Sequence, residues 1–148
     1  MNEITLENNS MPTVNGCNLC MAAEPFYHAD RVIPFHVLIY VTQGVIYVTE
    51  DTTDYEIRPG QLLFLKSDLH HFGKTEIPKG TQWYFVHFYL PDNSEKTSSH
   101  FVPSRMQLPQ YEAIQCSLDL PKQLLLLQGT PLEASIQNFV HYYLSDDP

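Results

Sequence analysis

Residues 31–90 constrain the fold of this chain more than any other stretch. Short runs rich in valine, isoleucine, tyrosine and phenylalanine alternate there with turn-forming pairs such as Gln43-Gly44 and Pro59-Gly60. Short β-type runs at this spacing are typical of an antiparallel β-sandwich or barrel. No segment of the stretch keeps the apolar period of about 3.6 residues that an amphipathic helix shows. The sequence therefore predicts a mainly β fold.

The individual runs give a set of expected strands. Leu62 to Leu65 is a short continuous apolar run, which is typical of a strand buried on both faces. Residues 104–128 stay open, because Leu124 to Leu127 fits either a buried strand or one turn of helix. The expected strands are 17–23, 30–41, 45–50, 55–58, 62–65 and 82–90, with one more short strand at 101–102.

The two ends of the chain differ in character. Residues 1–16 are polar and are expected to form an extended arm, and residues 17–103 the barrel. The segment 104–148 is expected to supply one or two helices for dimerisation or as a linker. Thr130 and Glu133 form a capping box around Pro131, which predicts a helix over about 131–144. Its apolar stripe packs either on its own barrel or on a second copy; the residues are Leu132, Ile136, Phe139, Val140 and Tyr143.

Charge and cysteine content limit the function. The 148 residues suffice for one domain with a real core. A net charge of -9 with only eight basic residues argues against direct binding of nucleic acid by this segment. No run is long enough to span a membrane, and the first ten residues lack a basic signal region, so we expect a cytoplasmic protein. Cys17 and Cys20 form a C-x-x-C pair, but on a strand they point to opposite faces, so we interpret them as core residues.

Four motifs occur in one order along the barrel region. They are YVTQG at 40–44, RPGQLL at 58–63, HHFG at 70–73 and WYFVHF at 83–88. Together they resemble a cupin and, more narrowly, the N-terminal effector-binding domain of AraC-type transcription regulators. The resemblance implies a cupin-type antiparallel β-barrel, or jelly roll, followed by helix. It also implies a helix-turn-helix DNA-binding domain, which is not present in this chain. We therefore expect the chain to be part of a longer regulator that contacts DNA through that other domain.

Metal-binding cupins hold their ion with two histidines spaced H-x-H, a glutamate and a final histidine. Counting from Gly44, the first three positions fall at or next to Arg31 and Ile33 and at Val37, none of which can coordinate a divalent cation. His36 is one residue out of register and should face away from the pocket. The last histidine is His70 or His71. We therefore expect no metal and no other cofactor.

Without metal ligands, the residues expected inside the barrel have the composition of a small-molecule pocket. Arg31 would offer a forked donor for hydroxyls or a carboxylate. Strand parity places Trp83, Phe85 and His87 on one face, and Tyr84, Val86 and Phe88 on the other. Apolar walls with a few convergent polar groups are typical of ligand sites.

The resemblance adds further candidates to this pocket. Phe85 stands where the family member that binds arabinose stacks a tryptophan on the sugar, and Phe72 stands where that protein has a tyrosine hydroxyl. His70 shares a face with Phe72, and the arm around Pro12 would close over the ligand as it does in that protein. The predicted ligand-binding residues are Arg31, His70, Phe72, Trp83, Phe85, His87 and Pro12. A sugar or another small polar effector is the expected ligand.

The leading hypothesis is thus a sensing and dimerising domain that is not an enzyme and forms a homodimer. One alternative is a metal-free cupin enzyme of the sugar isomerase or epimerase type, with His70 or His71 as general base. Such an enzyme would want a carboxylate partner. None falls on the expected inward positions, because Glu50, Asp51, Asp54 and Glu56 lie in or near expected turns. A stand-alone cupin binding protein is the other alternative.

Overall fold

A computed structural model describes residues 4–7, 12–90, 117–125 and 127–145. The strand expected at 101–102 lies outside these residues. The elements are β1 (Ile4–Glu7), β2 (Thr13–Met21), β3 (Arg31–Val32), β4 (His36–Gln43), β5 (Ile46–Glu50), β6 (Thr53–Ile57), β7 (Leu62–Leu65), β8 (His70–Phe72), β9 (Gln82–Tyr89), β10 (Ser117–Leu120), β11 (Gln123–Leu124) and α1 (Pro131–Ser145).

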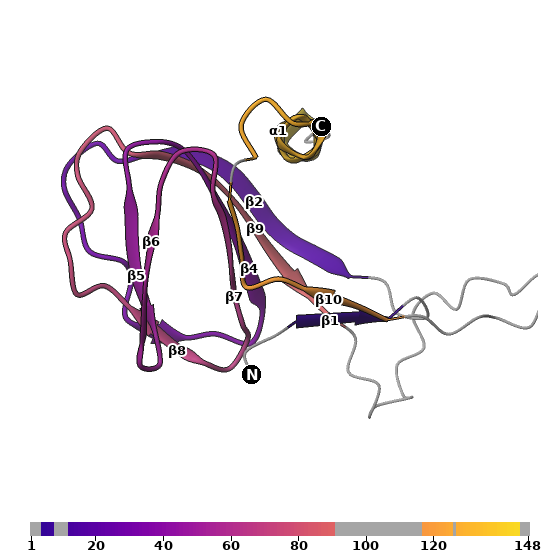
Figure 1. Ribbon diagram of the computed structural model, residues 1–148, viewed down its shortest axis with the longest axis horizontal. Helices are drawn as coiled ribbons and strands as arrows, with labels where there is room; N and C mark the ends of the chain where they lie inside the picture. Colours follow the sequence, from indigo (N-terminus) through magenta and orange to yellow (C-terminus); the bar gives the residue numbers. More distant parts are fainter. Residues whose placement is uncertain (1–3, 8–11, 91–116, 126, 146–148) are drawn as a thin grey trace, which may run out of the picture.

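Two antiparallel sheets form the body of the molecule (Figure 1). One has five strands in the order β11-β7-β4-β9-β2, and the other has four in the order β3-β8-β5-β6. A separate two-stranded ribbon pairs β1 with β10. The mainly β, cupin-type barrel predicted from the sequence is confirmed, and in the described part of the chain one helix follows it.

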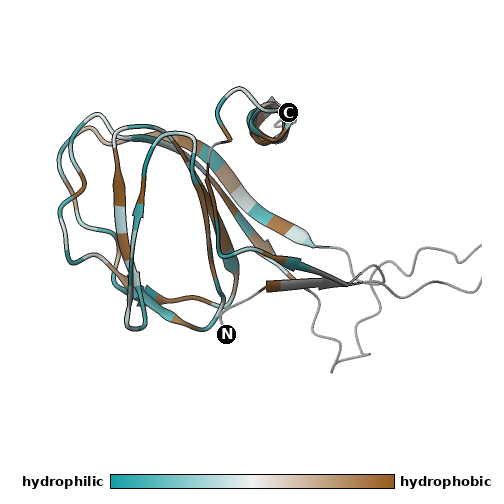
Figure 2. Ribbon diagram, in the orientation of Figure 1, coloured by the Kyte–Doolittle hydropathy of each residue, from teal (hydrophilic) through white to brown (hydrophobic). Residues whose placement is uncertain are grey.

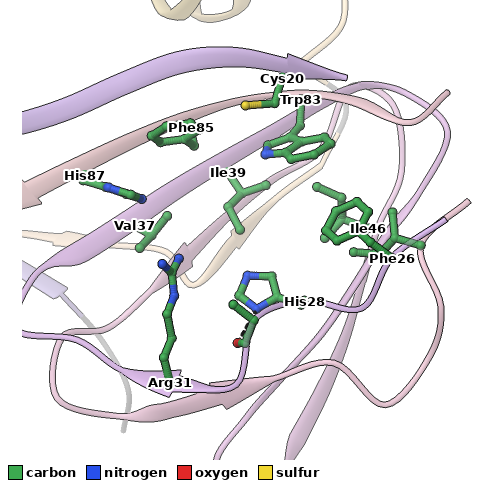
Figure 3. A pocket seen from close by; sticks show the side chains of 12 residues that line it. Cys20, Phe26, His28, Arg31, Val37, Ile39, Ile46, Trp83, Phe85 and His87 are labelled. Atoms are coloured by element: carbon green, nitrogen blue, oxygen red, sulfur yellow. Dashed lines mark hydrogen bonds between the residues drawn. The ribbon is translucent and has the colours of Figure 1, made fainter. Parts of the chain in front are cut away.

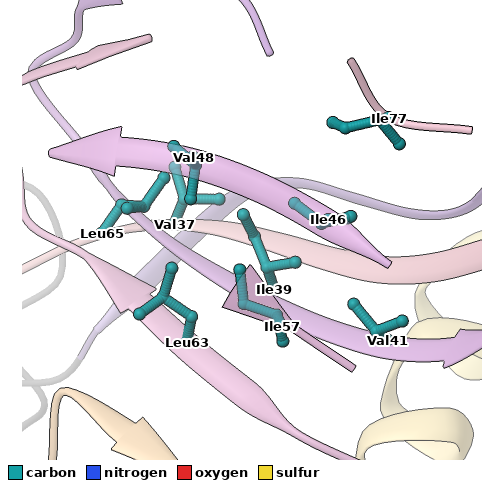
Figure 4. Close-up of a cluster of buried hydrophobic side chains, with 9 residues drawn as sticks. All are labelled: Val37, Ile39, Val41, Ile46, Val48, Ile57, Leu63, Leu65 and Ile77. Atoms are coloured by element: carbon teal, nitrogen blue, oxygen red, sulfur yellow. The ribbon is translucent and has the colours of Figure 1, made fainter. Parts of the chain in front are cut away.

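The space between the two sheets holds the inner core (Figure 4). β4 and β7 supply alternate residues to it from one sheet, and β5 and β6 supply residues from the other. Branched aliphatic side chains suit such a core, because they pack closely on a pleated surface. The inner core consists of Val37, Ile39, Val41, Ile46, Val48, Ile57, Leu63, Leu65 and Ile77.

The other face of the five-stranded sheet carries a second, outer core beneath α1. Here the intervening residues of β4, β7 and β9 meet the helix, so β7 is buried on both faces as its sequence predicts. Figure 2 shows apolar residues concentrated on the central strands β4 and β7, with polar residues interspersed along the edge strand β2. The outer core consists of Ile4, Tyr40, Leu62, Phe64, Phe88, Leu127 and Ile136.

The helix begins as the sequence predicts. The Glu133 backbone N–H donates to Thr130 Oγ1 at 3.3 Å, which is the first half of the capping box. The Glu133 carboxylate accepts from the Gly129 N–H and from the Tyr40 hydroxyl, the latter at 2.6 Å. The helix is therefore tied to β4. At 15 residues it is too short to cross a membrane, and it is the only helix in the described part of the chain.

The largest differences from the expected strand boundaries occur at two places. The run 30–41 is divided into β3 and β4, which belong to different sheets. Pro34 lies in the gap, where its ring removes the backbone donor that a continuous strand would need. β2 begins at Thr13, inside the region expected to be an arm, because it pairs along its length with β9 from Thr13–Tyr89 to Met21–Gln82.

Candidate functional site

A cavity of about 280 Å³ opens inside the barrel (Figure 3). Its walls come from β2, β3, β4, β5 and β9, from the irregular segment that precedes β3, and from the segment between β8 and β9. Nine of its twelve lining side chains are apolar. The lining residues are Cys20, Phe26, His28, Ala29, Arg31, Val37, Ile39, Ile46, Ile77, Trp83, Phe85 and His87.

The segment between β2 and β3 lacks regular strand structure, yet it is held firmly. Phe26 and Ile77 exchange two backbone hydrogen bonds, with N···O distances of 3.1 and 2.7 Å. The Gly73 N–H donates to the His28 carbonyl at 3.0 Å. A Cβ at Gly73 would lie 2.5 Å from the His28 nitrogen, so glycine permits this close approach. These contacts place Phe26 and His28 in the cavity wall.

Arg31 enters the cavity from β3, and Figure 3 shows its guanidinium directed toward Val37 and His87. Its Nε donates to Nε2 of His71, which lies opposite it on β8, at 3.1 Å. His71 is fully buried. Because Nε2 accepts this bond, the proton of the neutral ring is on Nδ1, which has no partner among the described residues. His71 thus orients the arginine.

Three imidazoles surround this arginine, and all are kept neutral near pH 7. Burial, followed by repulsion from neighbouring histidines and Arg31, lowers the pKa of His71 to about 4. Burial is also the main cause that lowers the pKa of His28, with Arg31 adding to it against an opposing bond to the Ala29 carbonyl. The pKa of His87 is lowered by burial and then by Arg31. Arg31 is consequently the one full positive charge among the lining residues.

Aromatic rings form the wall that faces the arginine. The Phe26 and Trp83 rings stack with centroids 5.6 Å apart. The His87 ring packs between Phe35 and Phe85, at centroid distances of 4.7 and 4.6 Å. Such a wall offers flat, apolar surface to a bound molecule, with ring nitrogens at its edges.

Four of the predicted site residues line this cavity: Arg31, Trp83, Phe85 and His87. Strand parity found the three on β9, and the same parity could have found Val37 and Ile39 on β4 and Ile46 on β5. No comparable signal marks Phe26, His28, Ala29 or Ile77, because they lie on irregular segments where the side-chain direction has no fixed period.

His70, Phe72 and Pro12 are not among the residues that line this cavity. On β8 the inward residue is His71, so His70 and Phe72 lie on the outer face, where their rings stack at 4.8 Å. His70 is half-exposed and bonds Asp30 at 2.7 Å. The prediction chose the wrong parity, which a shift of one residue inverts. Pro12 is exposed at the start of β2.

A buried carboxylate contradicts the expectation that none faces inward. Glu50 shares its face of β5 with Ile46 and Val48 and is fully buried. It pairs with the Lys122 ammonium and accepts from the Lys66 N–H at 2.8 Å. Burial lowers the pKa of Lys122, and the bond to Glu50 partly offsets this. The sequence places Glu50 in or near a turn at the end of its strand, but Glu50 still pairs with Thr53 and its side chain is buried before the turn begins.

The residues at the expected metal positions have other surroundings. Arg31 and Val37 line the cavity, and no group of three potential metal ligands occurs among the residues that the structure describes. His36 faces the outer core, as predicted, where it packs on Phe88 and accepts from the Ser67 N–H at 3.0 Å. Cys17 and Cys20 point to opposite faces, as predicted, with Cys17 beneath α1 and Cys20 in the cavity.

A comparison of the sequence with family models agrees with this barrel and its interior cavity. The model described as AraC-like ligand binding domain matches residues 22–140, which include the four-stranded sheet, the five-stranded sheet except its edge strand β2, and most of α1. The chain belongs to this family. The match covers every cavity-lining residue except Cys20 on β2.

A curated relative of this AraC-like domain matches part of the chain. An uncharacterized HTH-type transcriptional regulator, YisR, from Bacillus subtilis (strain 168), is 36% identical over 61 residues. The match covers 41% of this chain and 21% of YisR, so the chain spans about a fifth of that relative.

Two solved structures are similar to parts of the chain. The EutQ protein of Clostridium difficile has a TM-score of 0.41 and 16% identity, over 58% of this chain and 63% of EutQ. A putative mannose-6-phosphate isomerase from Ralstonia eutropha JMP134 has a TM-score of 0.35 and 19% identity, over 57% of this chain and 82% of that protein. Neither similarity bears on the function.

Proposed function

We propose that this domain senses a small organic effector that binds in the barrel cavity, and that it is part of a DNA-binding transcription regulator. The observation that carries the proposal is the cavity itself, in which the Arg31 guanidinium faces an aromatic wall. Its volume, about 280 Å³, is near the lower end of the usual range for ligand pockets, so a molecule of monosaccharide size or smaller fits.

The regulatory part of the proposal is supported by the family and by the partial match to YisR. The net charge of -9 does not favour DNA contact by these residues. DNA binding would therefore belong to another part of the longer polypeptide, with occupancy of the cavity as the input.

Binding without catalysis is the function that the site favours. A general base needs a partner that can exchange protons near the substrate. Glu50, the buried inward carboxylate, is held by Lys122 and the Lys66 N–H and is not among the cavity-lining residues. The lining residues themselves include no aspartate or glutamate.

We also propose that the domain forms a homodimer through α1. Ile136 and Val140 bury one face of the helix against the barrel, while its remaining apolar side chains are exposed. A surface of this kind suits an isologous contact with a second copy. The exposed residues are Leu132, Phe139, Tyr142, Tyr143 and Leu144.

Sedimentation should show a dimer at micromolar concentration. Phe139→Glu should abolish the dimer, and the control variant Asn138→Glu should keep it. A monomeric wild type would refute this proposal.

Effector binding can be followed through Trp83, because it is the only tryptophan in the chain and lines the cavity. A library of small metabolites that includes monosaccharides is screened by the change in tryptophan emission, and hits are titrated by calorimetry. Arg31→Ala and Trp83→Ala should each weaken binding. Losing one paired polar contact costs roughly 1–3 kcal/mol, which is about five- to hundredfold in affinity.

Arg58→Ala is the control, since this residue is exposed and does not line the cavity. It should leave affinity unchanged. Equal binding by wild type, Arg31→Ala and Trp83→Ala would contradict the proposal. So would a ligand-bound structure with the barrel interior packed solid and the ligand elsewhere.

A further inference from the structure

The cavity contains one permanent charge and little other polarity. Arg31 is its only arginine or lysine, and none of the twelve lining residues is acidic. The imidazoles of His28 and His87 are neutral near pH 7 for the reasons given above. The cavity therefore carries a net charge of about +1 inside a protein whose formal charge is -9.

No described carboxylate neutralises this arginine. The Arg31 guanidinium has no carboxylate oxygen of the described residues within the 4.0 Å of an ion pair; its recorded partner is the neutral ring of His71. The acids nearest in sequence and register are engaged elsewhere. Asp30 bonds His70 on the outer face, and Glu50 pairs with Lys122. A half-buried charge without a counterion favours an anion in the adjacent space.

The bond to His71 also decides which part of the guanidinium is available. It uses Nε and leaves both terminal nitrogens without a hydrogen-bond partner among the described residues, directed toward the cavity (Figure 3). Terminal N–H groups in one plane match the two oxygens of a carboxylate. His71 is fully buried, so the orientation of the fork is fixed before any ligand enters.

The opposite wall defines the rest of the ligand. Phe26 and Trp83 stack on each other, and Phe85 continues the same surface. Ile39, Ile46 and Ile77 form the floor. A sugar would bury several hydroxyl groups against these apolar side chains, and each unpaired hydroxyl would cost binding free energy.

We propose that the effector is a small carboxylic acid with an apolar body, such as an aryl or branched-alkyl carboxylate, held by Arg31 at one end and by the Phe26–Trp83 wall at the other. This inference rests on the proposed function, because it names the ligand class of the same cavity. It excludes neutral sugars as the preferred class.

The test compares acids with their neutral amides on the purified 148-residue chain. Benzoate, phenylacetate and 3-methylbutanoate are titrated beside benzamide, phenylacetamide and 3-methylbutanamide, with glucose and arabinose as sugar probes. Trp83 emission and calorimetry report binding. We expect at least one acid to bind about tenfold or more tighter than its own amide, as a hydrogen bond to a charged group predicts.

Arg31→Gln should reduce that preference to about twofold or less, while Arg58→Gln, at an exposed position, keeps it. Glutamine can still donate to His71, and the melting temperature checks that the fold is retained. Equal affinity of acid and amide in the wild type, or tighter binding of a sugar, would overturn the carboxylate inference and leave the cavity as the effector site. Binding of none of the eight probes at millimolar concentration would overturn the carboxylate inference as well. The wider metabolite screen then decides whether the cavity binds an effector at all.

Discussion

The ion pair between Glu50 and Lys122 allows a sharp test of how this barrel is stabilised. Glu50 is fully buried and the Lys122 side chain is only 18% exposed, so both charges were largely removed from water when the chain folded. Removing one partner of a buried pair costs about 3–5 kcal/mol, because the other charge stays buried. Lys122→Met keeps the aliphatic stem and deletes the ammonium. We expect it to lower the free energy of unfolding by about 3 kcal/mol, near the lower end because water still reaches Lys122.

Urea denaturation at pH 7 measures this loss, and a surface pair gives the control. Lys74→Met removes the partner of Asp54, where both side chains are about half-exposed or more, and exposed pairs contribute about 0–1 kcal/mol. The double variant Glu50→Gln/Lys122→Met should recover most of the loss, since glutamine still accepts from the Lys66 N–H. The reasoning is refuted if Lys122→Met costs no more than Lys74→Met.

Three further predictions follow from contacts near the site. His71 has a folded pKa of about 4, below the 6.5 of an unfolded histidine, so the unfolded state takes up the proton first as pH falls. The free energy of unfolding should therefore fall by roughly 3 kcal/mol between pH 6.5 and pH 4. Denaturation measured against pH should show a shallower fall in His71→Gln, and an equal fall would contradict this. Gly73→Ala pushes a Cβ against the His28 backbone, so it should lower the free energy of unfolding by about 1–3 kcal/mol and shift Trp83 emission. Gly16→Ala is the control and should do neither, because the nearest atom to its added Cβ is 4.0 Å away. Tyr40→Phe removes the bond to Glu133 and should speed hydrogen exchange in the first turns of α1, compared with Tyr47→Phe as the control; unchanged exchange would sink this prediction.

The regular parts of the fold could be predicted because their patterns are local. The four apolar residues of β7, the alternation on β9 and the capping box at Thr130 each specify an element within a few residues. Three of the twelve cavity-lining residues, Trp83, Phe85 and His87, followed from the same alternation. Arg31 was found by counting back from Gly44, even though Pro34 divides the expected strand there.

The remaining parts depend on contacts that a local pattern does not contain. Glu50 and Lys122 are 72 residues apart, and their pairing exists only once β11 joins the sheet beside β7. His28 is positioned by Gly73 through one backbone hydrogen bond, with no periodic strand on either side of it. The choice between His70 and His71 depended on the length of the loop before β8, which sequence counting alone did not fix.

β4 serves both sides of the five-stranded sheet at once. Val37 and Ile39 touch the cavity, and Tyr40, on the opposite face of the same strand, holds the carboxylate that caps α1. The cavity lining and the contact to the helix cap are therefore made by neighbouring residues on opposite faces of one strand. Close-packed interiors transmit strain because they compress little. We therefore expect that a ligand which displaces Val37 or Ile39 also shifts Tyr40 and, through its hydroxyl, the Glu133 carboxylate in the first turn of α1.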